Sequence, residues 1–340
     1  MSTGPPTIEW FGTTTFRLKV NNLTIFLDTW LERPSVLPKY LDIDSVIEAD
    51  YIVISHAHFD HLPGADRLAL KTGAQVLANS EAIRILRDAG VPEEQLINVA
   101  GGERVPLFTK EVREQAARGE CEVAPDPPGA PPRPAGNLAV AAVDVWPSLH
   151  CLMSGDHPEV FDTATKFTSN DHYASTLDIS RGMKYALLQL DKLVPEEYRD
   201  DGIKSFLAYI HDPKNKFSHC DGGQLMFNFR FDGKAVLFNA HMGAYEGIMR
   251  SLRPKPEIAI LGAAGQPNHD GRPFEGSPAE FARLECEWLE HPEKVVWCLH
   301  DESPIRPYRV DTTAATKAVN EQTKSKVWDL EPVKVYKLFE

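Results

Sequence analysis

Four apolar residues, Tyr51 to Ile54, lead directly into a polar stretch that contains three histidines and an aspartate. A short, continuous apolar run is typical of a strand that is buried on both faces of its sheet. The same succession of an extended run and a histidine recurs at His150, His241 and His300. Loops at the carboxyl ends of such strands are favoured positions for ligands and chemistry. The pattern therefore predicts an α/β protein with histidines at several strand ends.

The segments around these histidines alternate between extended and helical patterns. The predicted strands are apolar or alternating and are bounded by turn residues; they cover residues 8–19, 23–27, 51–54, 75–78, 138–145, 223–231, 234–239, 257–261 and 295–299. The predicted helices are bounded by cap, glycine or proline residues; they cover residues 64–71, 80–90, 108–119, 183–193, 195–209 and 278–290. Ser80 is the predicted cap of the second helix. Asn21-Asn22 and Asp232-Gly233 predict hairpin turns, and Ser277 with Glu280 predicts a capping box.

The length of 340 residues and the 42% of hydrophobic residues allow one large core, so residues 1–340 are expected to form a single domain. Residues 120–137 are rich in proline, which removes backbone donors and fixes φ, and they predict an exposed loop. Residues 151–212 show a weak pattern with helical segments. We interpret them as a cap or lid inserted within the domain.

Composition and net charge restrict the kinds of molecule that this protein is expected to bind. The formal net charge of −13, without a visible cluster of basic residues, disfavours nucleic acid as a substrate. We expect a small-molecule substrate, a cytoplasmic location and no membrane association, because no apolar run approaches the roughly 18 residues that span a bilayer. The five cysteines form no C-x-x-C pair and are interpreted as buried apolar residues. A homo-oligomer remains possible on this sequence.

The segment from His56 to His61 is the strongest chemical signal in the chain. His56, His58, Asp60 and His61 offer three imidazoles and one carboxylate within six residues, and zinc prefers such ligands. On an extended segment His56 and His58 point to the same side, whereas the adjacent pair Asp60-His61 can face a second ion. The sequence predicts a metal site with zinc as the first candidate, in one or two copies, and with manganese or iron as alternatives.

This segment, Ser55-His-Ala-His-Phe-Asp-His-Leu-Pro-Gly64, resembles the H-x-H-x-D-H motif of the metallo-β-lactamase superfamily. Residues 8–12 with the following hairpin to Asp28, and residues 143–150, are similar to the branch that contains L-ascorbate-6-phosphate lactonase. The resemblance implies an αββα sandwich, here with a helical cap insertion.

The resemblance also implies a ligand set. His56, His58 and His150 would bind one ion, and Asp60, His61 and His300 a second. The superfamily usually carries a bridging aspartate where this chain has His241. A histidine cannot bridge two cations as a carboxylate can, so His241 is either a ligand of one ion or a hydrogen-bonding neighbour. Asp28 is expected to orient a metal-bound histidine or to be a simple turn carboxylate.

The implied reaction is hydrolysis by a metal-bound hydroxide, with Asp60 and His61 as the catalytic residues. Asp60 would orient the hydroxide or carry a proton to the leaving group, or act as a ligand alone. Aromatic residues of the insertion are candidates for a substrate pocket, although they could equally be core residues. The candidate substrate-binding residues are Phe161, Tyr173, Tyr185 and, at the mouth of the site, His269.

A lactone, lactam or other simple ester or amide is the favoured substrate. Phosphodiester hydrolysis is the enzymatic alternative, and Arg181 and Lys184 keep it open as possible phosphate-binding residues. The same fold can hold iron for oxygen chemistry, so metal identity would separate a hydrolase from an oxygenase. A binding protein with a decayed site is a further alternative, which the complete motif from His56 to His61 argues against.

Overall fold

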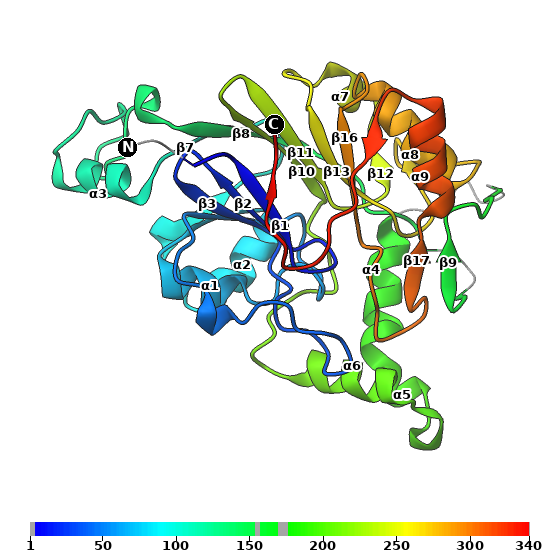
Figure 1. The fold of residues 1–340 in the computed structure, drawn as a ribbon. Coiled ribbons are helices and arrows are strands. Elements are labelled where there is room, and N and C mark those ends of the chain that lie inside the picture. The colour runs from blue at the N-terminus through cyan, green and yellow to red at the C-terminus, as the bar shows by residue number, and fades with distance from the viewer. Residues whose placement is uncertain (1–3, 154–156, 169–175, 340) are drawn as a thin grey trace.

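The computed structural model describes residues 4–153, 157–168 and 176–339, and it places two mixed β-sheets face to face (Figure 1). The first sheet has the order β19-β1-β2-β3-β4-β5-β6, with strands Tyr336–Lys337, Thr7–Trp10, Phe16–Val20, Leu23–Leu27, Tyr51–Val53, Gln75–Ala78 and Leu96–Asn98. The second has the order β18-β16-β13-β11-β10-β8-β7, with strands Lys326–Val327, Lys294–Cys298, Ile258–Gly262, Lys234–Asn239, Leu225–Phe231, Ala141–Pro147 and Arg104–Leu107.

The main core lies between these sheets. Alternate residues of their strands point inward and are fully buried, as the two-residue period of a strand requires. Phe16 of β2 meets Phe238 of β11 edge to face at a ring distance of 6.5 Å, which joins the two sheets near the ends of their strands. Burial of this apolar surface fixes the sheets against each other and therefore fixes the loops at their shared edge.

Helices cover the outer face of each sheet (Figure 1). The first sheet packs against α1, Ala65–Thr72, and α2, Ser80–Asp88, through a second apolar cluster. The second sheet packs against α7, Glu246–Ser251, α8, Pro278–Trp288, and α9, Thr313–Gln322, through a third. The expected αββα sandwich is confirmed.

The segment after His150 forms helices at one end of the sandwich. Helices α5, Leu190–Leu193, and α6, Asp201–His211, lie at the bottom of Figure 1, and α4, Thr176–Tyr185, rises from them towards the second sheet. Strand β9 of this segment, Val160–Asp162, pairs with β17, Arg309–Asp311, and the short strands β12, β14 and β15, Gly243–Ala244, Asn268–His269 and Arg272–Pro273, form a separate small sheet. Residues 120–137 follow α3, Lys110–Arg118, and lie in a largely exposed loop with one isolated bridge between Val123 and Pro134.

Several predicted boundaries were wrong for identifiable reasons. Residues 8–19 are two strands, because Gly12 (φ +90°) and Thr13 (φ +49°) make a tight turn between them. The cap of α2 is Asn79, whose side chain accepts a hydrogen bond from the Ala82 amide, and Ser80 is the first helical residue. The predicted helix over 183–193 is helical but interrupted: it comprises the end of α4, which begins at Thr176, a 3-10 turn at Leu187–Gln189, and α5. The capping box of Ser277 and Glu280 at α8 is confirmed.

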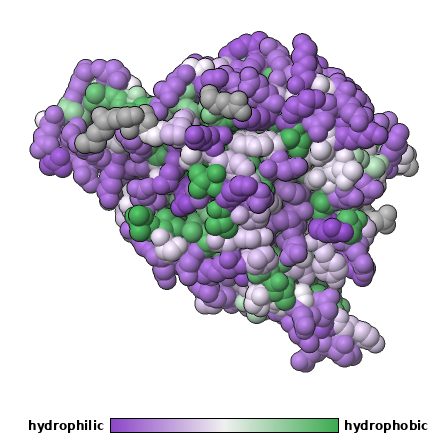
Figure 2. Space-filling view, in the orientation of Figure 1, coloured by the Kyte–Doolittle hydropathy of each residue, from purple (hydrophilic) through white to green (hydrophobic). Residues whose placement is uncertain are grey.

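The surface that Figure 2 presents is mostly hydrophilic, with small hydrophobic groups between charged residues. Within the described part of the chain, none of the helices combines the length and the apolar character that crossing a bilayer requires.

Candidate metal centre

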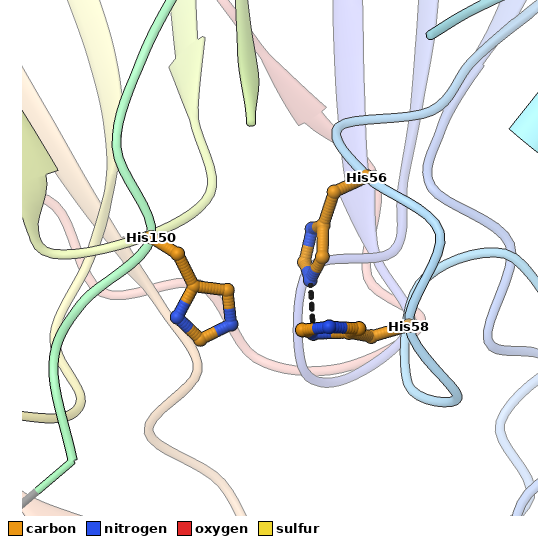
Figure 3. A group of neighbouring side chains, drawn as sticks. All are labelled: His56, His58 and His150. Atoms are coloured by element: carbon orange, nitrogen blue, oxygen red, sulfur yellow. Dashed lines mark hydrogen bonds between the residues drawn. The ribbon is translucent and has the colours of Figure 1, made fainter. Parts of the chain in front are cut away.

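Buried histidines from three separate loops meet at the edge where the two sheets come together. Each loop follows a strand end: β4 precedes the 56–61 segment, β8 precedes His150, and β11 precedes His241. Figure 3 shows the rings of His56 and His58 meeting, with His150 facing them from the other sheet's loop. All the members of this histidine cluster are buried; they are His56, His58, His61, His150 and His241.

The ring nitrogens are close enough to share ions. One ligand atom from each of His56, His58 and His150 lies within 4.8 Å of the others, and the same holds for His56, His61 and His241. His56 Nε2 lies 3.0 Å from His58 Nδ1. Two nitrogens bound to one tetrahedral zinc at about 2.0–2.1 Å are about 3.3 Å apart, so this pair already has nearly the required separation.

Unpaired nitrogens identify the side of each ring that is open to a ligand. The Nε2 atoms of His58, His61 and His241 are buried and have no hydrogen-bond partner in the described structure. An unpaired polar atom in the interior is unfavourable by roughly 1–3 kcal/mol, and His61 and His241, two of the three, belong to the same group of possible ligands. The residues present therefore fit a bound divalent ion.

The electrostatics of the cluster keep most of its rings neutral. Burial, reinforced by the neighbouring histidines, holds the pKa of His56, His58 and His241 well below its usual value. Burial also lowers the pKa of His150. Neutral imidazole is the form that binds a metal ion, so the cluster does not need to lose protons before it accepts one.

His61 is the member with a carboxylate partner. Asp28 Oδ2 lies 2.7 Å from His61 Nδ1, and Thr14 Oγ1 and Ser55 Oγ lie 3.0 and 3.2 Å from the same nitrogen. Burial acts to lower the pKa of His61, but the carboxylates of Asp60 and Asp28 outweigh it and raise that pKa. The structure thus places Asp28 where it can orient His61.

Asp60 lies at the rim of the cluster. Its Oδ2 is 3.5 Å from His61 Nε2, and its side chain is 22% exposed, whereas the histidine side chain is fully buried. Asp60 is absent from the ligand groups that the described residues form within 4.8 Å. This position suits contact with a substrate or with water. Its role as a ligand stays a prediction.

Helix α6 contacts the loop that carries Asp60. Tyr209 of α6 donates a hydrogen bond of 2.8 Å to the Phe59 carbonyl oxygen and accepts one of 2.9 Å from the Trp30 indole nitrogen. Phe59 also packs edge to face against Phe206 of α6, at a ring distance of 5.2 Å. Tyr209 is a site-forming residue that sequence patterns did not single out, because it is one of several aromatic residues in a weakly patterned segment.

His300 lies apart from the cluster. Its ring stacks on Trp10 at a centroid distance of 4.8 Å and an interplanar angle of 10°, and it belongs to no ligand group among the described residues. Leu299, immediately before it, has φ +57° and donates to the Thr13 carbonyl oxygen, which turns the chain at the end of β16. The structure does not bring His300 to the other predicted ligands.

The candidate substrate-binding residues are dispersed. Phe161 is buried in β9 and stacks on Phe167, and Tyr185 is 59% exposed on α4, where Arg181 and Lys184 lie over its ring. His269 stacks on Trp288 of α8. Tyr173 lies outside the described residues. None of the three that are described contacts the histidine cluster, so their predicted role remains untested.

Residues 24–143 match the family model described as beta-lactamase superfamily domain. A UPF0173 metal-dependent hydrolase from Pyrobaculum islandicum is 30% identical over 118 residues, which is 33% of this chain and 52% of that relative. The chain thus spans about half the length of this curated relative.

Solved structures resemble the chain over nearly all of its length. A metallo hydrolase from the archaeon Ignicoccus hospitalis matches with a TM-score of 0.55 and 19% identity, covering 98% of both chains. The diiron β-hydroxylase CmlA from Streptomyces venezuelae matches with a TM-score of 0.52 and 13% identity, covering 99% of this chain and 55% of that one. The chain has the metallo-β-lactamase fold. In this fold the segment from His56 to His61 lies within the matched domain, whereas His150 and His241 lie beyond its end at residue 143.

Proposed function

We propose that this chain is a metal-dependent hydrolase that opens a lactone, a lactam or another simple ester or amide. The observation that carries the proposal is the buried cluster of histidines with three unpaired Nε2 atoms. The similarity of residues 24–143 to the superfamily domain and the name of the Pyrobaculum relative support the same reading.

The ligand set follows from the two groups of ring nitrogens. His56, His58 and His150 would hold one ion, and His61 with His241 would hold a second, with His56 close to both groups. A bound divalent ion acidifies water and polarises a carbonyl oxygen, so no serine or cysteine nucleophile is needed. Zinc suits this donor set, and manganese or iron can also bind imidazole and carboxylate.

Asp60 is proposed to move the proton. Its carboxylate lies at the rim, where a substrate and water can reach it, and Oδ2 is 3.5 Å from His61 Nε2. In this role Oδ2 accepts a proton from the attacking water and passes it to the leaving oxygen or nitrogen. Asp28 holds His61 from the opposite side, so that the ring does not rotate when Asp60 changes charge.

The charge around the cluster favours a substrate with little negative charge. Burial lowers the pKa of His150, and the carboxylates of Asp221 and Asp60 oppose that shift from nearby. A phosphodiester would meet these carboxylates. Arg181 and Lys184, the cations considered for phosphate binding, lie on the exposed side of α4 over the Tyr185 ring. The sequence resemblance to the ascorbate-6-phosphate lactonase branch is a separate argument, because it favours a carbonyl bond as the bond that is cleaved.

The first test is metal content of the purified protein by elemental analysis, comparing wild type with His56→Ala and His241→Ala. We expect near-stoichiometric zinc or manganese that is lost in His56→Ala and reduced in His241→Ala. Iron as the native metal would favour oxygen chemistry of the kind named for the CmlA neighbour. Failure of the wild-type protein to take up metal, even after reconstitution, would contradict the proposal.

A substrate panel then separates the two hydrolytic reactions. The metal-loaded protein is offered lactones of different ring size, p-nitrophenyl acetate and bis-p-nitrophenyl phosphate. We expect turnover of a lactone or ester that disappears in His56→Ala. Preferential cleavage of the phosphodiester would replace the carbonyl substrate with a phosphate one.

A further inference from the structure

Cys151 lies between His150 and His241, each of which also belongs to a histidine group with His56, and the three side chains themselves lie close enough to form a possible ligand group. Its Sγ is 3.5 Å from His241 Nδ1 and 3.6 Å from His150 Nδ1, and the two imidazole rings stack at a centroid distance of 3.7 Å. The thiol is buried with both rings. Neither the ligand set nor the proton transfer proposed above uses it.

The backbone carbonyl of Cys151 determines the tautomer of His150. The Cys151 carbonyl oxygen lies 2.8 Å from His150 Nδ1. Because a carbonyl oxygen can only accept a hydrogen bond, Nδ1 of His150 must carry the proton. The Nε2 lone pair of that ring is then free to bind an ion. Hydrogen bonds of this kind to the far ring nitrogen fix the tautomer and the direction of a ligand histidine.

The side chain of Cys151 stands in the corresponding position for His241. Sγ is the hydrogen-bonding neighbour of His241 Nδ1, and the Nε2 atom on the other side of the ring is buried and unpaired. When Nδ1–H donates to the sulfur, Nε2 keeps its lone pair and points away from Cys151. His241 thus has a thiol beside Nδ1, on the side of the ring opposite its unpaired nitrogen.

The surrounding chain holds Cys151 in place. Leu152 exchanges two backbone hydrogen bonds with Gln266, at 2.8 and 3.1 Å, and Asn268 donates a hydrogen bond of 2.9 Å to the His150 carbonyl oxygen. Gly265 has φ +89°, and a Cβ atom built there would lie 2.5 Å from Sγ. A side chain at this position would displace the thiol, so the fold leaves room for the sulfur to reach His241.

We propose that Cys151 is a positioning residue that orients His241, so that the Nε2 lone pair of His241 points into the histidine cluster. This inference rests on the proposed function, because it assigns His241 as a metal ligand. The backbone carbonyl orients His150 in the same way, so one residue connects the two ligand groups.

The test measures zinc affinity in metal-free protein against a competing chelator. Cys151→Ala removes the contact with His241. Cys151→Ser has one hydroxyl group more than the alanine variant, and this hydroxyl can still pair with His241 Nδ1. We expect Cys151→Ala to weaken, by about 10–100-fold, the zinc-binding step that His241→Ala also weakens. Cys151→Ser is expected to weaken it less. Equal losses in the alanine and serine variants would indicate packing alone and would overturn the proposal.

A double-mutant cycle shows whether the effect passes through His241. In the His241→Ala background the additional Cys151→Ala change is expected to leave zinc affinity unaltered, because the positioned ring is gone. An additive loss would overturn the positioning role. Thermal unfolding of the metal-free variants tests whether each one folds. If Cys151→Ala does not fold, the cycle is measured with Cys151→Ser instead.

The outcomes also separate this inference from the proposed function. A wild-type protein that binds no zinc contradicts both. A wild-type protein that binds zinc, with an affinity that Cys151→Ala leaves unchanged, contradicts the positioning role and leaves the hydrolase proposal standing.

Discussion

Asp28 and His61 form a fully buried pair, with Asp28 Oδ2 2.7 Å from His61 Nδ1. The same carboxylate accepts hydrogen bonds of 2.8 and 2.9 Å from the backbone amide and the hydroxyl of Ser55. A residue at the end of β3 therefore fixes both the start of the motif loop and the direction of one of its histidines. The opposite nitrogen, Nε2, is left facing the cluster.

Asp28→Asn is expected to lower zinc affinity by about 10–100-fold, because the amide keeps the shape of the side chain but loses the charge that orients His61. Competition titration with a chelator measures the change. Asp44→Asn, at an exposed aspartate outside the motif and outside the histidine cluster, is the matched control and should leave the affinity unchanged. Wild-type zinc affinity in Asp28→Asn would show that the carboxylate is a turn residue only.

Asp28→Ala should also destabilise the metal-free protein. The change leaves the Ser55 amide without its buried acceptor and leaves only the Thr14 and Ser55 hydroxyls beside His61 Nδ1, and breaking such a buried pair is destabilising by about 3–5 kcal/mol. Urea unfolding followed by circular dichroism gives the difference in free energy of unfolding. A loss in the free energy of unfolding of less than about 0.5 kcal/mol, as for an ordinary surface substitution, would mean that the Asp28–His61 pair contributes little to stability.

Asp60→Asn separates proton transfer from metal binding. If Asp60 Oδ2 moves the proton, kcat should fall by about 10²–10⁴-fold while the zinc content stays close to that of the wild type. Steady-state kinetics on the best ester or lactone, with elemental analysis of the same sample, provide both quantities. Loss of zinc in parallel with activity would instead identify Asp60 as a ligand.

The sequence was most informative where chemistry is local. The segment from His56 to His61 places its ligand types within six residues after a buried strand, so its position at a strand end followed from pattern alone. His150 and His241 could be placed because each follows a strand end, and parallel or adjacent strands bring such ends together. The structure brings these histidines to one point, whereas their exact partners, such as Thr14 and Ser55 at His61, depend on tertiary packing.

The sequence was least informative where one backbone angle or one distant contact decides the outcome. His300 also follows a strand, but the left-handed conformation of Leu299 and the stacking on Trp10 are not visible in periodicity. The strands β18 and β19 are two residues long and carry no detectable period. Cys151 has no spacing motif, and only adjacency to His150 could have drawn attention to it.

Tyr209→Phe is expected to loosen the cap from the motif loop. Removal of the hydroxyl leaves the Phe59 carbonyl oxygen and the Trp30 indole nitrogen without their partner in a buried environment, which is unfavourable by about 1–3 kcal/mol. Urea unfolding measures the change. Tyr198→Phe is the control, because Tyr198 is 74% exposed and its substitution should alter the free energy of unfolding by less than about 0.5 kcal/mol. Equal effects of the two changes would contradict a role for Tyr209 in holding this loop.

Glu285 of α8 gives the protein a dependence of stability on pH. Its side chain is fully buried. Its Oε1 accepts a hydrogen bond of 3.3 Å from the side-chain amide of Asn239, and its Oε2 has no partner among the described residues. Burial raises the pKa of Glu285 well above the usual value of 4.5, so the folded protein keeps a proton that the unfolded chain releases. This contribution to stability is present below about pH 4.5 and is lost as the pH rises towards the folded-state pKa.

Glu285→Gln should therefore be more stable than the wild type at pH 8, because the amide is neutral in both states, and the difference should shrink towards pH 5. Urea unfolding of metal-free protein at both pH values gives the comparison, with the exposed Glu197→Gln as the control that should show no such trend. The same free-energy difference at pH 5 and pH 8 would mean that Glu285 is ionised in the folded protein. Its carboxylate would then have to be stabilised by the hydrogen bond from the Asn239 side-chain amide, whose own oxygen accepts a hydrogen bond of 2.7 Å from Ser148.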